Sequence, residues 1–131
     1  MSGVAAPAAE EFFFRGFFYR ALRTRLGALM AALIDGLLFG AVHYEGPKTA
    51  LLLPVLAALG FIFCLVYEKT GTLFATIGLH ALNNTIAFGV STQRWTVAAA
   101  VGGTMLTACA VAPRVIGARA APRAARAPAS A

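Results

Sequence analysis

The sequence predicts an all-α protein, a multi-pass transmembrane bundle of about five helices, and three observations support this. First, 60% of the 131 residues are hydrophobic and only 12% are charged, whereas soluble domains carry about 25% charged residues. Second, the mean hydropathy is +0.77. Third, apolar runs of about 18 residues, the lower end of what spans a bilayer, are separated by short polar turns. A soluble bundle would need polar stripes along its helices, which this sequence lacks.

Apolar length and helix-breaking residues place the five helices. The first begins near Ala8 and ends among arginines near Arg25. The next three end at turn signals rich in Gly, Pro or polar residues. The fifth begins at Trp95, an aromatic residue suited to the membrane interface. The predicted helices are therefore residues 8–25, 26–43, 49–67, 72–90 and 95–112.

Residues 1–112 are predicted to form one membrane core, because a chain of this length allows a single small bundle. From Pro113 onward, Ala, Pro and Arg dominate and no acidic residue occurs. Such a composition buries too little apolar surface to fold, so residues 113–131 are predicted to be a disordered basic tail. Its arginines lack interleaved aromatic residues, which favours membrane lipids over nucleic acid as its partner.

The net charge of +6 carries topological information. If the helices alternate in direction, the end of the first helix, the 68–71 loop and the tail share one face and hold most of the Lys and Arg residues. The positive-inside rule predicts that this face is cytoplasmic. Cys64 and Cys109 lie in apolar runs with no metal-binding spacing, so they are interpreted as packing residues.

Three polar clusters interrupt the apolar runs: Glu10-Glu11-x-x-x-Arg15, Phe39-x-x-x-His43 and His80-x-x-x-Asn84. An unpaired ionisable side chain costs several kcal/mol in hydrocarbon, so such residues indicate a function. At a rise of 1.5 Å per residue, the clusters lie about 17–26 Å from the arginine-rich ends of their helices. We therefore expect the three clusters to meet in one layer of the bundle.

The first cluster contains two carboxylates in different situations. Glu11 and Arg15 are four residues apart, so they share a helix face and can neutralise each other. Glu10 points about 100° away and has no such partner. It is the better candidate for a general base, since an apolar pocket makes an unpaired carboxylate more basic. The alternative is that both glutamates stabilise the start of the helix through its dipole.

The other two clusters offer hydrogen-bonding groups. A neutral imidazole at His43 can share a water with a carboxylate, although a lone His at a helix end is also a common structural feature. His80 and Asn84 share a face and can hold an oxyanion, or can hydrogen-bond to a neighbouring helix. Asp35 is interpreted as a structural partner of a neighbouring helix, below the shared layer. Beside it lies a ridge of small residues, which favours close helix packing: Ala28, Ala32, Gly36 and Gly40.

Taken together, the three clusters resemble the CPBP family, which comprises type II CAAX prenyl proteases and their bacterial relatives and is also called the Abi family. The resemblance covers about residues 5–89, with every defining motif position present. It implies an intramembrane endopeptidase in which Glu10 and His43 activate a water. His80 and Asn84 would stabilise the oxyanion, and Glu11 and Arg15 would orient the site. Family members carry further spanning helices before the first motif, so a core shortened relative to the family is expected.

The leading hypothesis is therefore an intramembrane endopeptidase in a bacterial-type cell membrane. Its substrate would be a peptide or membrane protein, with or without a prenyl group. Two histidines and a glutamate match a zinc triad in ligand type, but no HExxH occurs and Asn84 is a poor zinc ligand. The sequence thus favours a mechanism without a cofactor and leaves a divalent metal such as zinc open. Two other classes are a non-catalytic immunity or scaffold protein and a small proton- or ion-path protein.

Overall fold

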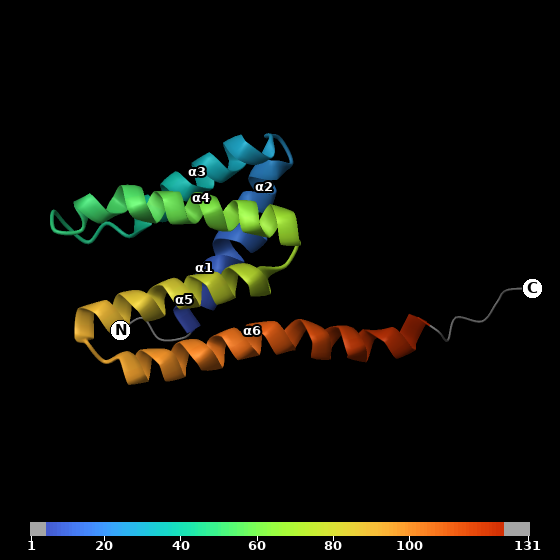
Figure 1. Cartoon of the computed structure of the whole chain (residues 1–131). Coiled ribbons are helices and arrows are strands. Elements are labelled where there is room, and N and C mark those ends of the chain that lie inside the picture. Colours follow the sequence, from blue (N-terminus) through green and yellow to red (C-terminus); the bar gives the residue numbers. More distant parts are fainter. Residues whose placement is uncertain (1–4, 125–131) are drawn as a thin grey trace, which may run out of the picture.

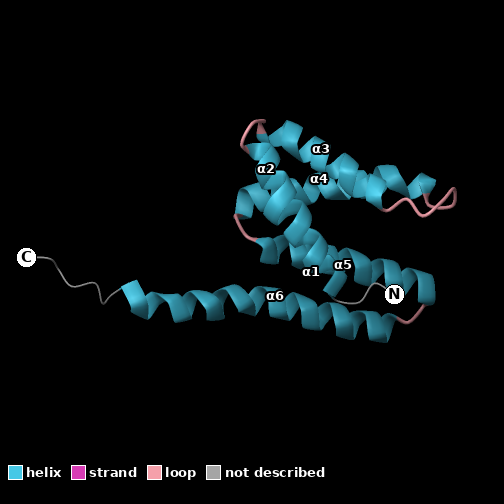
Figure 2. Cartoon of the chain, turned by 180° about the vertical axis from the view of Figure 1, so that it is seen from behind, coloured by secondary structure: helices cyan, strands magenta, loops and turns pink. Residues whose placement is uncertain are grey.

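The computed structural model describes residues 5–124, and the surroundings of side chains are described for residues 7–116. Within this part of the chain every regular element is a helix (Figure 2). The first segment is continuous and joins α1 (Ala5–Glu11), a π-helix (Phe12–Tyr19) and α2 (Arg20–Arg23). The all-α prediction is confirmed, with five helical segments. The other segments are α3 (Ala28–Val42), α4 (Leu53–Thr70) with a 3₁₀ turn at Ala50–Leu52 before it, α5 (Leu73–Thr92) and α6 (Trp95–Ala124).

The helices form two hairpins joined by the first segment. Figure 1 shows α3 lying against α4, and α5 lying against α6, with the first segment crossing these helices at a steep angle. Along its length α1 contacts α5, the π-helix contacts α3, α4 and α5, and α2 contacts α3. The first segment is therefore the element that brings the two hairpins together.

The helix ends follow local backbone chemistry. Gly46, in the turn between α3 and α4, has φ 129°, and Gly71, which ends α4, has φ 67°. Both are positions where an L side chain would be strained. α3 has 15 residues, fewer than the predicted 26–43, so it is about 22 Å long. It starts later because Gly27 is extended, with ψ 157°.

The last helix corrects one prediction. α6 does not end near Ala112 but continues to Ala124, so residues 113–124 extend the helix. Ala and Arg are strong helix formers, and this local preference continues the helix through Pro113, where one backbone hydrogen bond is absent. The remaining residues of the predicted tail, 125–131, lie outside the described part of the chain.

The distribution of polarity is that of a membrane protein. Glu11, Arg15 and Asp35 are fully buried, whereas large apolar side chains such as Leu29 and Leu51 are exposed. A water-soluble fold places charged groups outside and rarely exposes large apolar patches. Three helical stretches are long and apolar enough to cross a membrane, Ala50–Thr70, Leu73–Thr92 and Trp95–Ile116. The protein is a membrane protein.

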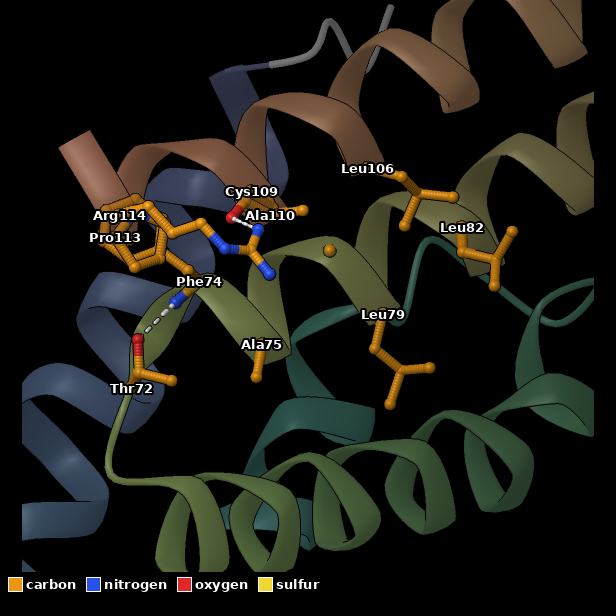
Figure 3. A pocket seen from close by; sticks show the side chains of 11 residues that line it. Thr72, Phe74, Ala75, Leu79, Leu82, Leu106, Cys109, Ala110, Pro113 and Arg114 are labelled. Atoms are coloured by element: carbon orange, nitrogen blue, oxygen red, sulfur yellow. Dashed lines mark hydrogen bonds between the residues drawn. The ribbon is translucent and has the colours of Figure 1, made fainter.

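Basic residues gather at one end of the bundle. Arg23 on α2 donates to the Glu68 carboxylate near the end of α4, with Nη2 and Oε1 2.6 Å apart. This hydrogen bond is the main cause that raises the pKa of Arg23 above its ordinary value. Arg114 of α6 and Thr72 at the start of α5 line one apolar cavity of about 580 Å³ (Figure 3). The grouping expected from helix alternation is thus present in the described residues.

The predicted ridge of small residues is the contact surface between α3 and α4. A Cβ atom on Gly36 would lie 2.6 Å from the Ala57 carbonyl oxygen and 2.7 Å from the Phe61 nitrogen. A Cβ on Gly40 would lie 2.8 Å from the Leu53 carbonyl oxygen. The two backbones therefore approach too closely for any side chain at these positions.

We expect Gly36→Ala to lower the free energy of unfolding by about 1–3 kcal/mol, because the added methyl group forces two backbones apart. Unfolding in mixed detergent micelles, followed by helical circular dichroism, measures this change. Gly103→Ala on α6 is the matched control, since its Cβ would meet no atom within 4 Å. Equal effects of the two substitutions would contradict a tight α3–α4 contact.

Candidate active site

The first segment presents its polar residues on one buried face. Glu11 ends α1 and Arg15 lies in the π-helix, and both side chains are fully buried. Phe14 and Tyr19, also in the π-helix, are buried with them. π-helices are rare and occur often at functional sites. The apolar pattern predicts an ordinary helix here, because side-chain periodicity alone does not distinguish a π-helix over so short a stretch.

Glu11 and Arg15 form the ion pair expected from their spacing. Arg15 Nη1 lies 3.0 Å from Glu11 Oε1, and Arg15 Nη2 donates to the Gly60 carbonyl at 2.7 Å. The guanidinium carbon lies 4.7 Å from the centre of the Phe39 ring and 5.2 Å from that of Phe63. A cation held by a carboxylate, a carbonyl and aromatic faces is well compensated for its burial.

His43 follows the last residue of α3, where the chain leaves the helix. Its Nδ1 is 2.7 Å from the Phe39 carbonyl oxygen, which can only accept, so Nδ1 carries the proton. Its ring also lies against the Phe39 ring, with centroids 4.7 Å apart. The four-residue spacing of Phe39 and His43 therefore fixes both the orientation and the tautomer of the imidazole, and leaves Nε2 free to act.

His80, on α5, is almost fully buried between the Phe39 and Phe63 rings. Its Nδ1 lies 2.8 Å from Glu11 Oε1, so the first and third clusters are in direct contact. With Glu11 as a carboxylate paired to Arg15, the proton of this hydrogen bond sits on Nδ1. Glu11 thus orients His80, as the supporting role expected from the sequence requires.

The two histidines converge on one oxygen of Glu10. Its Oε2 atom lies 3.7 Å from His43 Nε2 and 3.7 Å from His80 Nε2. These separations are too long for direct hydrogen bonds. The Glu10 and His43 side chains are 33% and 32% exposed, whereas His80 is 5% exposed. Glu10 Oε2 itself is buried and has no hydrogen-bond partner among the described residues, so one unpartnered carboxylate oxygen faces both imidazole rings.

Asn84 is the last of the six predicted site residues. It lies one turn after His80 on α5 and is half-buried, and among the described residues its side chain makes no hydrogen bond. Its place in a shared cavity with Glu10 stays a prediction. The apolar cavity in Figure 3 lies elsewhere, between α5 and α6, and is not lined by the residues of the three clusters.

Three residues contact the site although the sequence predicts no role in it for them: Asp35, Cys64 and Gly60. Asp35 Oδ2 lies 3.7 Å from Arg15 Nη2 and accepts a hydrogen bond from the Cys64 thiol at 3.0 Å. The expected pairing of Asp35 with a neighbouring helix is confirmed, but its partner belongs to the first cluster itself. The signal in the sequence for a role of Asp35 was a carboxylate within an apolar run. Nothing in the sequence marks Cys64 as its donor or Gly60 as a ligand of Arg15.

The described residues contain no group of three His, Cys, Asp or Glu side chains arranged to hold a metal ion. Glu10, His43 and His80 are nevertheless ligands of the types that zinc accepts.

Comparisons with known proteins identify the family to which the chain is similar. A family model described as type II CAAX prenyl endopeptidase Rce1-like matches residues 1–86. YdiL of Bacillus subtilis (strain 168), whose name provisionally describes a membrane peptidase, is 33% identical over 85 residues, 65% of this chain and 33% of YdiL. YyaK of the same organism, named as uncharacterized, is 37% identical over 82 residues, 59% of this chain and 27% of YyaK. The chain thus spans about a third of these relatives or less. No solved structure matches it.

Proposed function

The chain belongs to the Rce1-like family of type II CAAX prenyl endopeptidases, and on that premise we propose that it is an intramembrane endopeptidase. It would hydrolyse a peptide bond of its substrate with a water that Glu10 and His43 activate. The observation that supports this most is the approach of both imidazole Nε2 atoms to the Glu10 carboxylate, each at 3.7 Å. A carboxylate and an oriented imidazole around one water are the parts that general-base catalysis requires.

In the proposed reaction, Glu10 takes a proton from the water while the water oxygen attacks the peptide carbonyl carbon. The proton then passes to the amine that leaves when the carbon–nitrogen bond breaks. His43 Nε2 accepts the second proton of the water in a hydrogen bond, because its Nδ1 proton is bound to the Phe39 carbonyl. The water is thus oriented from two sides.

The oxyanion would be stabilised from α5. Because the Nδ1 proton of His80 is donated to Glu11, a hydrogen bond from Nε2 to the oxyanion requires the doubly protonated ring. The Asn84 amide, one turn further along α5, would supply the second donor. Glu11 and Arg15 would act by holding His80 in place.

The substrate would be a peptide segment presented at or within the bilayer, with or without a prenyl group, and the relatives in Bacillus subtilis favour a bacterial cell membrane as the location. Reconstitution of the full chain into phosphatidylethanolamine/phosphatidylglycerol liposomes tests this proposal. We would add internally quenched peptides with and without a farnesylated C-terminal cysteine, and analyse products by mass spectrometry. Cleavage by the wild type that depends on Glu10 would support the proposal. A chain that binds these peptides but cleaves none would favour the scaffold class.

We propose that no metal takes part, so chelation should leave the rate of hydrolysis unchanged. Treatment with EDTA and with 1,10-phenanthroline, followed by addition of zinc, measures this on the same peptides. Loss of activity on chelation, with recovery on adding a divalent metal, would instead make Glu10, His43 and His80 metal ligands.

Asn84→Ala is expected to lower the hydrolysis rate by roughly 100- to 1000-fold, as the loss of one oxyanion donor typically does. Its KM should change little, since the interaction forms mainly in the transition state. Steady-state kinetics on the cleaved peptide measures both values. Asn83→Ala is the matched control, because it removes the same amide from the neighbouring position on α5. A full rate in Asn84→Ala would remove this residue from the site.

A further inference from the structure

A continuous chain of buried polar contacts runs from α4, through α3 and the first segment, to His80 on α5. The Cys64 thiol on α4 donates to Asp35 on α3 at 3.0 Å, and Asp35 lies 3.7 Å from Arg15. Arg15 binds Glu11 at 3.0 Å, and Glu11 binds His80 at 2.8 Å. The proposed mechanism uses only the end nearest His80. Asp35 and Cys64 are fully buried and have no role in it.

Asp35 is a second carboxylate beside Arg15, in addition to Glu11. Arg15 already has a counterion in Glu11 and an acceptor in the Gly60 carbonyl. Burial of a further carboxylate is costly, and an apolar residue of similar size often serves the fold as well or better. Asp35 therefore calls for an explanation in terms of what it does to Arg15.

The atoms of Glu11 indicate that effect. Oε1 accepts from both Arg15 and His80, while Oε2 is buried with no hydrogen-bond partner among the described residues. An arginine that meets a single carboxylate commonly binds both of its oxygens through parallel hydrogen bonds. Here Arg15 binds one oxygen of Glu11 only, and its Nη2 is directed to Gly60 and Asp35. Glu11 thereby remains free to hold the imidazole of His80.

We propose that Asp35 is a positioning residue, which holds Arg15 away from a two-oxygen contact with Glu11 and so keeps Glu11 bound to His80 Nδ1. The Cys64 thiol donates to the Asp35 carboxylate at 3.0 Å but is not required for the charge of Asp35 to act on Arg15. Asp35 does not touch the reacting atoms and acts only through Arg15. Its effect on hydrolysis rests on the proposed function, whereas its effect on the His80 ring does not.

The ring nitrogens of the two histidines can be observed directly, because His43 and His80 are the only histidines in the chain. The full chain, labelled with ¹⁵N-histidine in detergent micelles, should show a His80 Nδ1–H signal that is protected from exchange with water. A His43→Gln sample assigns it. In Asp35→Asn, which removes the charge at nearly constant size, and in Asp35→Ala, this signal should be lost or broadened by exchange. Cys64→Ala keeps the carboxylate and is the local control, in which the signal should persist.

Kinetics on a cleaved peptide supplies the second measurement. In Asp35→Asn, kcat should fall roughly 10- to 100-fold, as losses of outer supporting contacts often do, with KM within about twofold because the substrate contacts are intact. An unchanged His80 signal in a folded Asp35 variant would overturn the proposal. So would failure of both variants to fold with wild-type helicity, since Asp35 would then act through the fold. A wild type without peptidase activity that still shows the expected ring signals would refute the proposed function and leave the positioning role intact.

Discussion

Glu10→Gln is expected to abolish nearly all hydrolysis, a loss of about 100- to 10,000-fold, which is the usual contribution of a general base. Gln retains the size of Glu and its ability to accept a hydrogen bond, but it does not take a proton from water. The carboxylate oxygen that faces His43 and His80, each at 3.7 Å, would be replaced by an amide group. Initial rates on the quenched peptides in liposomes measure the loss.

Glu45→Gln is the matched control for this experiment. Glu45 is an exposed residue in the turn after α3, and its substitution removes one carboxylate from the chain without touching the site, so the rate should stay at the wild-type level. Glu10→Gln should also fold with wild-type helicity, because Glu10 makes no buried ion pair of the kind Glu11 makes. A Glu10→Gln protein that hydrolyses peptides at the wild-type rate would assign the base to another group and contradict the mechanism.

Arg15→Met should have the largest effect on the fold, lowering the free energy of unfolding by about 3–5 kcal/mol, because removal of one partner leaves buried carboxylates uncompensated. Glu11 and Asp35 would both lose their counterion, and the Gly60 carbonyl would lose its donor. Met retains much of the length and apolar character of the Arg side chain, so the loss of charge is isolated. Unfolding in mixed micelles measures the change.

Arg23→Met provides the comparison. Arg23 pairs with Glu68 where both side chains are about a third exposed, 35% and 36%, and exposed ion pairs contribute little to stability. Its substitution should therefore change the unfolding free energy much less than Arg15→Met does. Similar losses in the two variants would show that the buried Arg15 network is no more important to the fold than a surface pair.

Relationships within one helix were determined by the sequence. The four-residue spacings predicted that Glu11 and Arg15 pair and that a ridge of small residues meets a neighbouring helix. Both are observed. Helical geometry is repetitive, so residues four apart share a face wherever the helix is placed. Composition likewise determined that this is a membrane protein. When lipid is the solvent, apolar side chains face outward and charged side chains are buried.

Contacts between helices were decided by the tertiary structure alone. The sequence did not indicate that Glu11 binds His80, that Asp35 reaches Arg15, or that a backbone carbonyl at Gly60 binds the same guanidinium. Each of these contacts depends on the angle at which the first segment crosses the two hairpins, and on a π-helix that periodicity does not distinguish. Spacing along a chain fixes rotation about one helix axis, whereas the packing of several helices fixes which of those faces meet.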